Sequence, residues 1–283
     1  MGAGYNCRMP LVYAAILPHG GEIVPQLTEN PALMEKTRSA MQEAGRRFAE
    51  ARPETVIVLD PHADFMVPGA IVVGATFQAA GILGDPDGRY IEASFSVDTK
   101  LVEQVFSESH GFFPLIRAVG EKERRKAVLP LSWGALIPLW FTAHPQAEPR
   151  PEVVIVAPHR AVPRATLVGF GNLLARVAES SRKRVALIAS ADQGHAHDAS
   201  GPYGFSAKSA EYDLHYAEAV ATENLGALLD FDEAFLQDAK IDSFWQTIIL
   251  AGALDHTPLT GELLSYEAPT YFGMLVATYT KQN

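Results

Sequence analysis

The stretch TVIVLDPHAD, residues 55–64, decides how the chain is organised. Its opening residues are apolar or β-branched, as in a buried strand, and Pro61 then prevents the strand's hydrogen-bond ladder from continuing. His62 therefore stands just past the end of the strand, and in an open α/β sheet ligands bind outside the carboxyl ends of the strands. The stretch LVYAAILPHGG, residues 11–21, places His19 after a second apolar run in the same way. The two histidines are predicted to share one site.

Strands and helices alternate through the rest of the sequence. Further strands are expected at residues 69–75, 152–157, 184–191 and 271–279, and helices at 31–50, 97–110, 165–179, 206–224 and 242–254. Residues 128–143 indicate a turn followed by a buried helix, and residues 81–90 read as a loop rich in turn residues. This alternation predicts an α/β fold, a single domain spanning residues 1–283 with a central mostly parallel or mixed sheet and helices on both faces.

Composition narrows the classes of protein and partner. The chain has 283 residues, 48% of them apolar, which is enough for one large domain with a sizeable core. Cys7 is the only cysteine, and the first residues resemble no secretory signal, so a cytoplasmic location is expected. The apolar run 11–17 is too short to span a bilayer. A net charge of -10 argues against a nucleic-acid surface. Neither a nucleic acid nor a membrane is therefore expected as a partner.

Two more histidines follow predicted strands. His195 comes after the strand at 184–191, and His159 comes after the strand at 152–157. A single strand-end histidine is more often a polar surface residue than a ligand, but repetition of the pattern in one chain favours function. His195 would join the other two histidines if their strands are neighbours. The roles of His159 and of His197, which faces either the pocket or solvent, stay open.

The order of these segments resembles a known family. LPHGG (17–21), LDPHAD (59–64), SADQGHAH (190–197) and a late YEAPTYFG (266–273) are similar to the class III extradiol dioxygenases, the superfamily of the catalytic subunit of protocatechuate 4,5-dioxygenase. The resemblance covers about residues 11–279. It implies a non-haem Fe(II) held by two histidines and one carboxylate, with three metal positions open; zinc or manganese can take such a site in a crystal.

The resemblance also implies roles for individual residues. His19 and His62 correspond to the two histidine ligands, and His195 corresponds to the acid–base histidine beside the metal. O2 would be the co-substrate, and a small aromatic molecule the partner. A homodimer or pairing with a related subunit is expected, as in relatives.

The third ligand leaves two interpretations open. The family has a glutamate near the start of a late apolar helix, whereas this chain reads KIDSFWQTIILAGAL at residues 240–254, with Asp242. Asp242 is either the carboxylate ligand or the N-cap of the helix, since aspartate is a favoured cap. Glu233 and Glu262 are the alternative ligands.

The surroundings of the site depart from the family pattern at one place. Many relatives have Asp-His where this chain has Ser132 and Trp133, so Trp133 would stack on an aromatic ring or fill core. A metal-bound histidine needs an acceptor for its second ring nitrogen, and Asp60 or Asp64 could serve His62. Asp60 would otherwise be a turn residue. If the substrate carries a carboxylate, Arg89 and Arg160 are the candidate residues to bind it. The sequence does not identify the substrate.

These patterns predict a non-haem Fe(II)-dependent extradiol dioxygenase that cleaves a catechol- or aminophenol-type ring with O2. His195 would act first as general base and then as general acid. Two alternatives stay open: a zinc-dependent metallohydrolase, because two histidines and a carboxylate also bind catalytic zinc, and a non-catalytic subunit or binding protein on the same scaffold.

Overall fold

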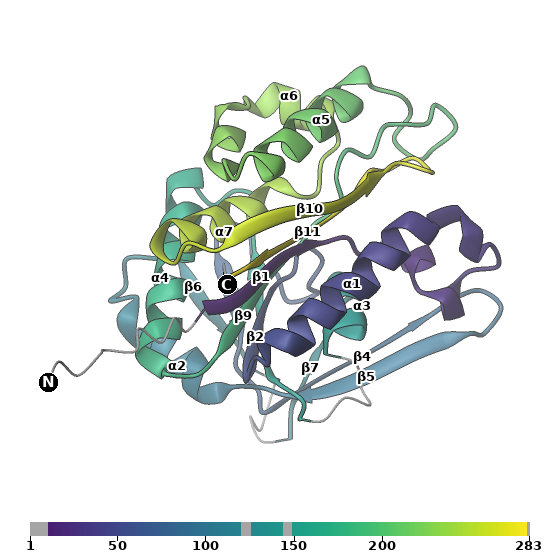
Figure 1. Ribbon diagram of the computed structural model, residues 1–283. Helices are drawn as coiled ribbons and strands as arrows, with labels where there is room; N and C mark the ends of the chain where they lie inside the picture. Colours follow the sequence, from purple (N-terminus) through teal and green to yellow (C-terminus); the bar gives the residue numbers. More distant parts are fainter. Residues whose placement is uncertain (1–10, 120–125, 144–148, 282–283) are drawn as a thin grey trace, which may run out of the picture.

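The structure is a computed structural model that describes residues 11–119, 126–143 and 149–281. The strands are β1 (Leu11–Leu17), β2 (Thr55–Leu59), β3 (Ile71–Gly74), β4 (Gln78–Gly84), β5 (Tyr90–Ser96), β6 (Leu115–Ala118), β7 (Val128–Pro130), β8 (Glu152–Pro158), β9 (Val185–Ser190), β10 (Thr260–Glu267) and β11 (Met274–Thr280). Eight of them form a mixed sheet in the order β10-β11-β1-β9-β2-β8-β3-β6, and the other three form a small sheet in the order β5-β4-β7 (Figure 1).

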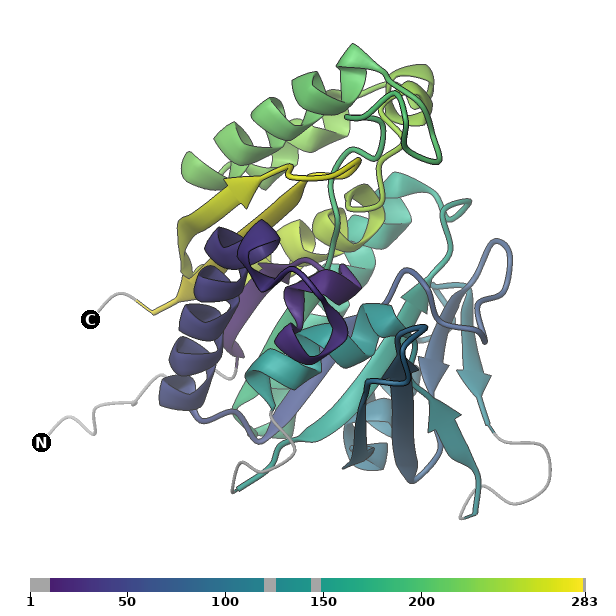
Figure 2. The same cartoon turned by 90° about the vertical axis from the view of Figure 1, so that its right-hand side faces the viewer.

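The helices pack in layers on the two faces of the large sheet (Figures 1 and 2). They are α1 (Glu35–Ala51), α2 (Thr99–Glu108), α3 (Trp133–Thr142), α4 (Arg164–Ser181), α5 (Ala207–Ala221), α6 (Glu233–Asp238) and α7 (Phe244–His256), with short 3-10 turns η1 (Gly21–Ile23), η2 (Pro25–Leu27), η3 (Pro31–Met34) and η4 (Leu225–Asp230). Helices α1 and α3 lie together on one face, and α2, α4 and α7 lie on the other. The predicted α/β class with a mixed sheet is confirmed.

Helices α4 and α7 approach each other closely because glycines line their contact. A Cβ atom on Gly171 would lie 1.8 Å from the carbonyl oxygen of Ile249, and one on Gly252 would lie 2.0 Å from that of Val168. Only glycine fits at either position. This contact sets the position of α7 against α4, and α7 follows Asp242 of the site described below. Of the helices described, none combines the length and the apolar character needed to cross a membrane.

The four central strands, β1, β9, β2 and β8, are parallel to one another. The run TVIVL of β2 is buried at every position, as expected for a strand covered on both faces. Because the strands are parallel, their carboxyl ends meet at one edge of the sheet. The segments that carry His19, His62 and His195 leave the sheet from that edge.

Several elements differ from the prediction. Residues 81–90 are not a loop: they belong to the hairpin β4–β5, whose turn is closed by the Asp85 carboxylate accepting from the N–H groups of Asp87 and Arg89. Glycines at 81 and 84 masked the strand, although β5 alternates buried and exposed residues along its length. Strands β6, β7 and β10 were not predicted either, and β7 replaces the turn expected at the start of residues 128–143. The expected domain range 1–283 includes Cys7 and other positions that lie outside the described residues.

Candidate metal centre

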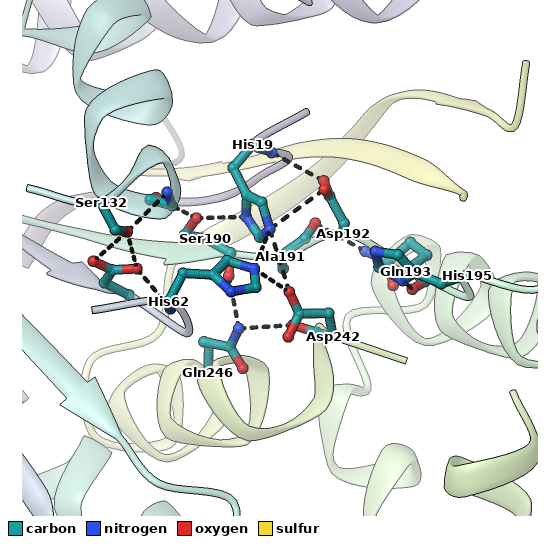
Figure 3. Close-up of polar contacts among 12 residues, drawn as sticks. His19, His62, Ser132, Ser190, Ala191, Asp192, Gln193, His195, Asp242 and Gln246 are labelled. Carbon is teal, nitrogen blue, oxygen red and sulfur yellow. Dashed lines mark hydrogen bonds and ion pairs between the residues drawn. The ribbon is translucent and has the colours of Figure 1, made fainter. Parts of the chain in front are cut away.

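Three side chains from distant parts of the chain converge at the carboxyl edge of the sheet (Figure 3). His19 follows β1, His62 follows β2, and Asp242 precedes α7. The Nε2 atoms of the two histidines are 3.1 Å apart. Oδ2 of Asp242 lies 2.7 Å from Nε2 of His62 and 3.3 Å from Nε2 of His19. The structure thus brings together the three residues that the sequence singled out as metal ligands.

Hydrogen bonds fix the orientation and tautomer of His19. The Ser190 hydroxyl donates to the carbonyl oxygen of Gly134, which can only accept. Ser190 Oγ must therefore accept from Nδ1–H of His19, at 2.8 Å. Nε2 then faces His62 and Asp242 and is the ring nitrogen available to a proton or a metal ion. A buried imidazole held in this tautomer is prepared to bind a cation.

Asp192 adds a second support for His19. One oxygen of its buried carboxylate accepts the backbone N–H of His19 at 2.9 Å, and the other lies 3.3 Å from Nε2 of the same residue. Ser190 and Asp192 both lie in the SADQGHAH segment, but nothing in the sequence indicated that they contact His19.

His62 is held differently, through its backbone and one ring face. The Asp60 carboxylate accepts the backbone N–H of His62 at 2.9 Å and the hydroxyl of Ser132 at 2.8 Å. Asp60 is therefore a turn residue, and its carboxylate binds the backbone of His62 rather than the ring; Asp64 is exposed. The indole of Trp133 stacks on the imidazole with centroids 4.4 Å apart and, at 44% exposed, does not fill core.

Asp242 is not the cap of α7. Ser243 stands immediately before the first residue of the helix, and the Asp242 carboxylate points to the histidines (Figure 3). Its Oδ1 accepts from Nη2 of Arg160 at 2.7 Å, while Oδ2 is buried and has no hydrogen-bond donor. Among the described residues, neither alternative carboxylate joins the two histidines: Glu233 pairs with Arg164, and Glu262 pairs with Arg47.

The electrostatics of the site favour a positive charge between the imidazoles. Burial alone would lower the pKa of His19, but the Asp192 and Asp242 carboxylates raise it to about 9. Burial would raise the pKa of Asp242, yet the two imidazoles hold it well below its usual range. Two imidazole nitrogens and one carboxylate oxygen around a point with an unsatisfied buried acceptor fit a divalent transition metal.

His195 faces the same cleft as the metal site. The cleft has a volume of about 610 Å³, and its lining includes His62, Asp242, His195, Arg160, Tyr203, Lys240 and Trp245. Nδ1–H of His195 donates to the carbonyl oxygen of Gln193 at 2.8 Å, so Nε2 carries the lone pair. Its ring stacks on Phe272 with centroids 5.5 Å apart. This arrangement suits a general base.

A buried carboxylate that the sequence did not reveal holds the His195 segment. Asp213 accepts the backbone N–H of Gly194, a ring N–H of His197 and the hydroxyl of Tyr266. The ring of His197 is thereby tied to Asp213, and His197 is not among the residues that line the cleft. Asp213 lies in the middle of α5, where a charged residue is ordinarily solvent-exposed, so no local signal marked it.

The remaining candidates separate into structural and cleft residues. Nδ1 of His159 accepts the N–H groups of Gly69 and Ala161, which closes a turn at the margin of the cleft. Arg89 pairs with Asp85 in the β4–β5 turn, away from the site. Of the two arginines considered for substrate binding, Arg160 alone lines the cleft.

Comparisons with known proteins found a matching family model, a curated relative and a solved structure of similar fold. The family model described as the catalytic LigB subunit of aromatic ring-opening dioxygenase matches residues 13–277. A curated relative, Protein CA_C1420 of Clostridium acetobutylicum, is 22% identical over 256 residues, which cover 89% of this chain and 54% of that protein. The chain thus spans about half the length of this relative. The crystal structure of the uncharacterized protein JW3007 from Escherichia coli K12 has a similar fold, with a TM-score of 0.59, 18% identity, and coverage of 94% of this chain and 99% of that one.

Proposed function

The chain belongs to the family of the catalytic LigB subunit of aromatic ring-opening dioxygenases, and on this basis we propose that it is a non-haem Fe(II)-dependent extradiol dioxygenase that cleaves a catechol- or aminophenol-type ring with O2. One observation carries the proposal: His19, His62 and Asp242 gather their ligand atoms within 4.8 Å of one another beside a cleft that His195 also lines. A metal bound by three protein ligands on one side has open positions on the other, so two further molecules can bind to it together.

The donor set supports iron as the metal. Imidazole and carboxylate suit Fe(II), and two histidines with one carboxylate make the facial arrangement of non-haem Fe(II) oxygenases. When bound, the iron supplies the one-electron chemistry by which O2 reacts with an aromatic ring. His19, His62 and Asp242 would hold it, with Ser190 and Asp192 keeping the His19 imidazole in place.

His195 performs the proton transfers in this proposal. Because its Nδ1–H is bound to the carbonyl of Gln193, Nε2 is free to accept the proton of a substrate hydroxyl. The resulting imidazolium can return that proton later in the reaction. The stacked ring of Phe272 and the edge of Tyr203 restrict the rotation of the imidazole. These contacts keep the acid–base group in one orientation.

The test is oxygen uptake. The protein is loaded with Fe(II) without oxygen and then screened with catechols and aminophenols in an oxygen electrode. We expect the wild type to consume O2 with one of these compounds, and His195→Ala to retain the metal but lose activity by about 10²–10⁴-fold, the range for a positioned acid–base group. Wild-type-like turnover in His195→Ala would refute the acid–base role.

The same experiment separates the alternatives. Turnover that proceeds without oxygen would indicate a metal-assisted hydrolase, and failure to take up any metal would indicate a non-catalytic binding protein. The identity of the ring, assembly as a homodimer or with a related subunit, and a cytoplasmic location stay predictions.

A further inference from the structure

The two oxygens of the Asp242 carboxylate face different neighbours. Oδ1 lies 2.7 Å from Nη2 of Arg160, whereas Oδ2 lies 2.7 Å from Nε2 of His62 and has no donor of its own. A carboxylate on a short side chain can turn about its last bond and present either oxygen, or both, to a cation. Something must therefore select Oδ2.

Arg160 is itself held in place. Its guanidinium carbon lies 4.6 Å from the ring centroid of Trp245, and Trp245 is the second residue of α7, three residues after Asp242. The arginine comes from the segment that follows β8, so it bridges the Asp242 carboxylate and the indole of α7 from a separate part of the chain. Stacking on an indole and a charge-assisted hydrogen bond each restrict a guanidinium that is otherwise 54% exposed.

We propose that Arg160 is the positioning residue for the carboxylate ligand. By occupying Oδ1 it directs Oδ2 alone to the histidine pair, so that Asp242 binds the metal through one oxygen and leaves the cleft side of the metal open. Within the described residues, Asp242 is the only carboxylate that pairs with Arg160, which gives the guanidinium a single fixed task. The inference rests on the proposed metal site and adds to it the residue that sets its geometry.

The test uses Co²⁺, whose visible absorption reports coordination number and geometry directly. In Arg160→Ala the carboxylate is free to bind through both oxygens, so we expect a changed Co²⁺ spectrum. We also expect an affinity lower by about 10-fold or more, as for other outer partners of metal ligands. Arg160→Lys keeps the charge and one donor, and should recover much of the wild-type spectrum.

Arg164→Ala is the matched control, because Arg164 pairs with Glu233 and the carbonyl of Phe231 and makes no ion pair with Asp242. Its Co²⁺ spectrum should match the wild type. A wild-type spectrum in Arg160→Ala, whatever its affinity, would overturn the positioning role and leave the metal site intact. Failure of the wild type itself to bind Co²⁺ would refute the metal site and this inference together.

Discussion

Two buried aspartates stand at opposite ends of the parallel strands, and both pair with a cation. Asp98 lies near the amino ends of β2 and β8, where its carboxylate binds Lys183. Asp242 lies at the carboxyl edge, where its carboxylate binds Arg160. The exposed fraction is 1% for Asp98 and 4% for Asp242, so burial does not distinguish them. Their remaining contacts do.

Asp98 has a donor for each of its oxygens. Oδ1 accepts the backbone N–H of Leu101 and so caps α2, while Oδ2 accepts from the hydroxyl of Thr55 and the ammonium of Lys183. Asp242 has a donor at Oδ1 only, and its Oδ2 faces two imidazole nitrogens. A buried carboxylate oxygen without a donor is costly unless a cation binds it. The satisfied aspartate is structural, and the unsatisfied oxygen of the other supports the proposed metal site at the opposite end of the sheet.

The largest expected effect is the loss of metal from Asp242→Ala. Removing one of the three proposed ligands should weaken Zn²⁺ or Co²⁺ binding by more than about 100-fold, since outer partners of ligands alone contribute roughly 10–100-fold. Competition with a chromophoric chelator measures this. Asp98→Ala, at the other end of the strands, should bind the metal as the wild type does. Equal losses in the two variants would remove the distinction between the two ends.

The second-largest expected effect is on folding stability, and it belongs to Asp98 rather than to Asp242. Asp98→Ala removes the cap of α2 and two hydrogen bonds to a charged group, which should lower the free energy of unfolding by about 2–3 kcal/mol. Lys183 keeps Glu152 as a partner at 2.8 Å, so no isolated charge is left buried. Urea unfolding of the metal-free protein tests this value. A change in the free energy of unfolding below about 0.5 kcal/mol would show that Asp98 and its partners do not stabilise the fold.

The sequence predicted the sheet edge well because its signals are local. An apolar run ended by proline and histidine identifies a strand and its carboxyl end without reference to the rest of the fold, and β1 and β2 were found in this way. The order of the segments then placed His195 beside the same edge. Lining of one cleft by His62 and His195 is consistent with that expectation.

What the sequence left open depends on contacts between distant residues. Asp242 precedes a helix, so cap and ligand fitted equally well until its Oδ2 was found 2.7 Å from Nε2 of His62, a residue far away in the sequence. Ser190 is an ordinary strand residue in the sequence, and its value to His19 arises only because β1 and β9 are neighbours. Tertiary contacts of this kind have no local pattern.

The smallest effect is the pH dependence of the Asp98 contribution. Burial alone would raise the pKa of Asp98, but Lys183, Thr55 and the N–H of Leu101 outweigh it and hold the pKa below its usual range. A group with a lowered folded pKa stabilises the fold above its unfolded pKa of roughly 3.9 and loses that contribution as the pH falls through the folded value. The destabilisation by Asp98→Ala should thus be constant from about pH 5 to 8 and shrink below about pH 4.

Unfolding curves from pH 7 to pH 3 measure the difference in the free energy of unfolding between wild type and Asp98→Ala. For one proton this difference should change by no more than about 1.4 kcal/mol per pH unit. Because the two aspartates have no partner in common, the difference should be the same with and without bound Zn²⁺. A difference that persists unchanged to pH 3 would mean that Asp98 does not act through its charge. A difference that changes on metal binding would mean that the two ends of the sheet are coupled, and the structural and functional carboxylates could then no longer be treated as independent.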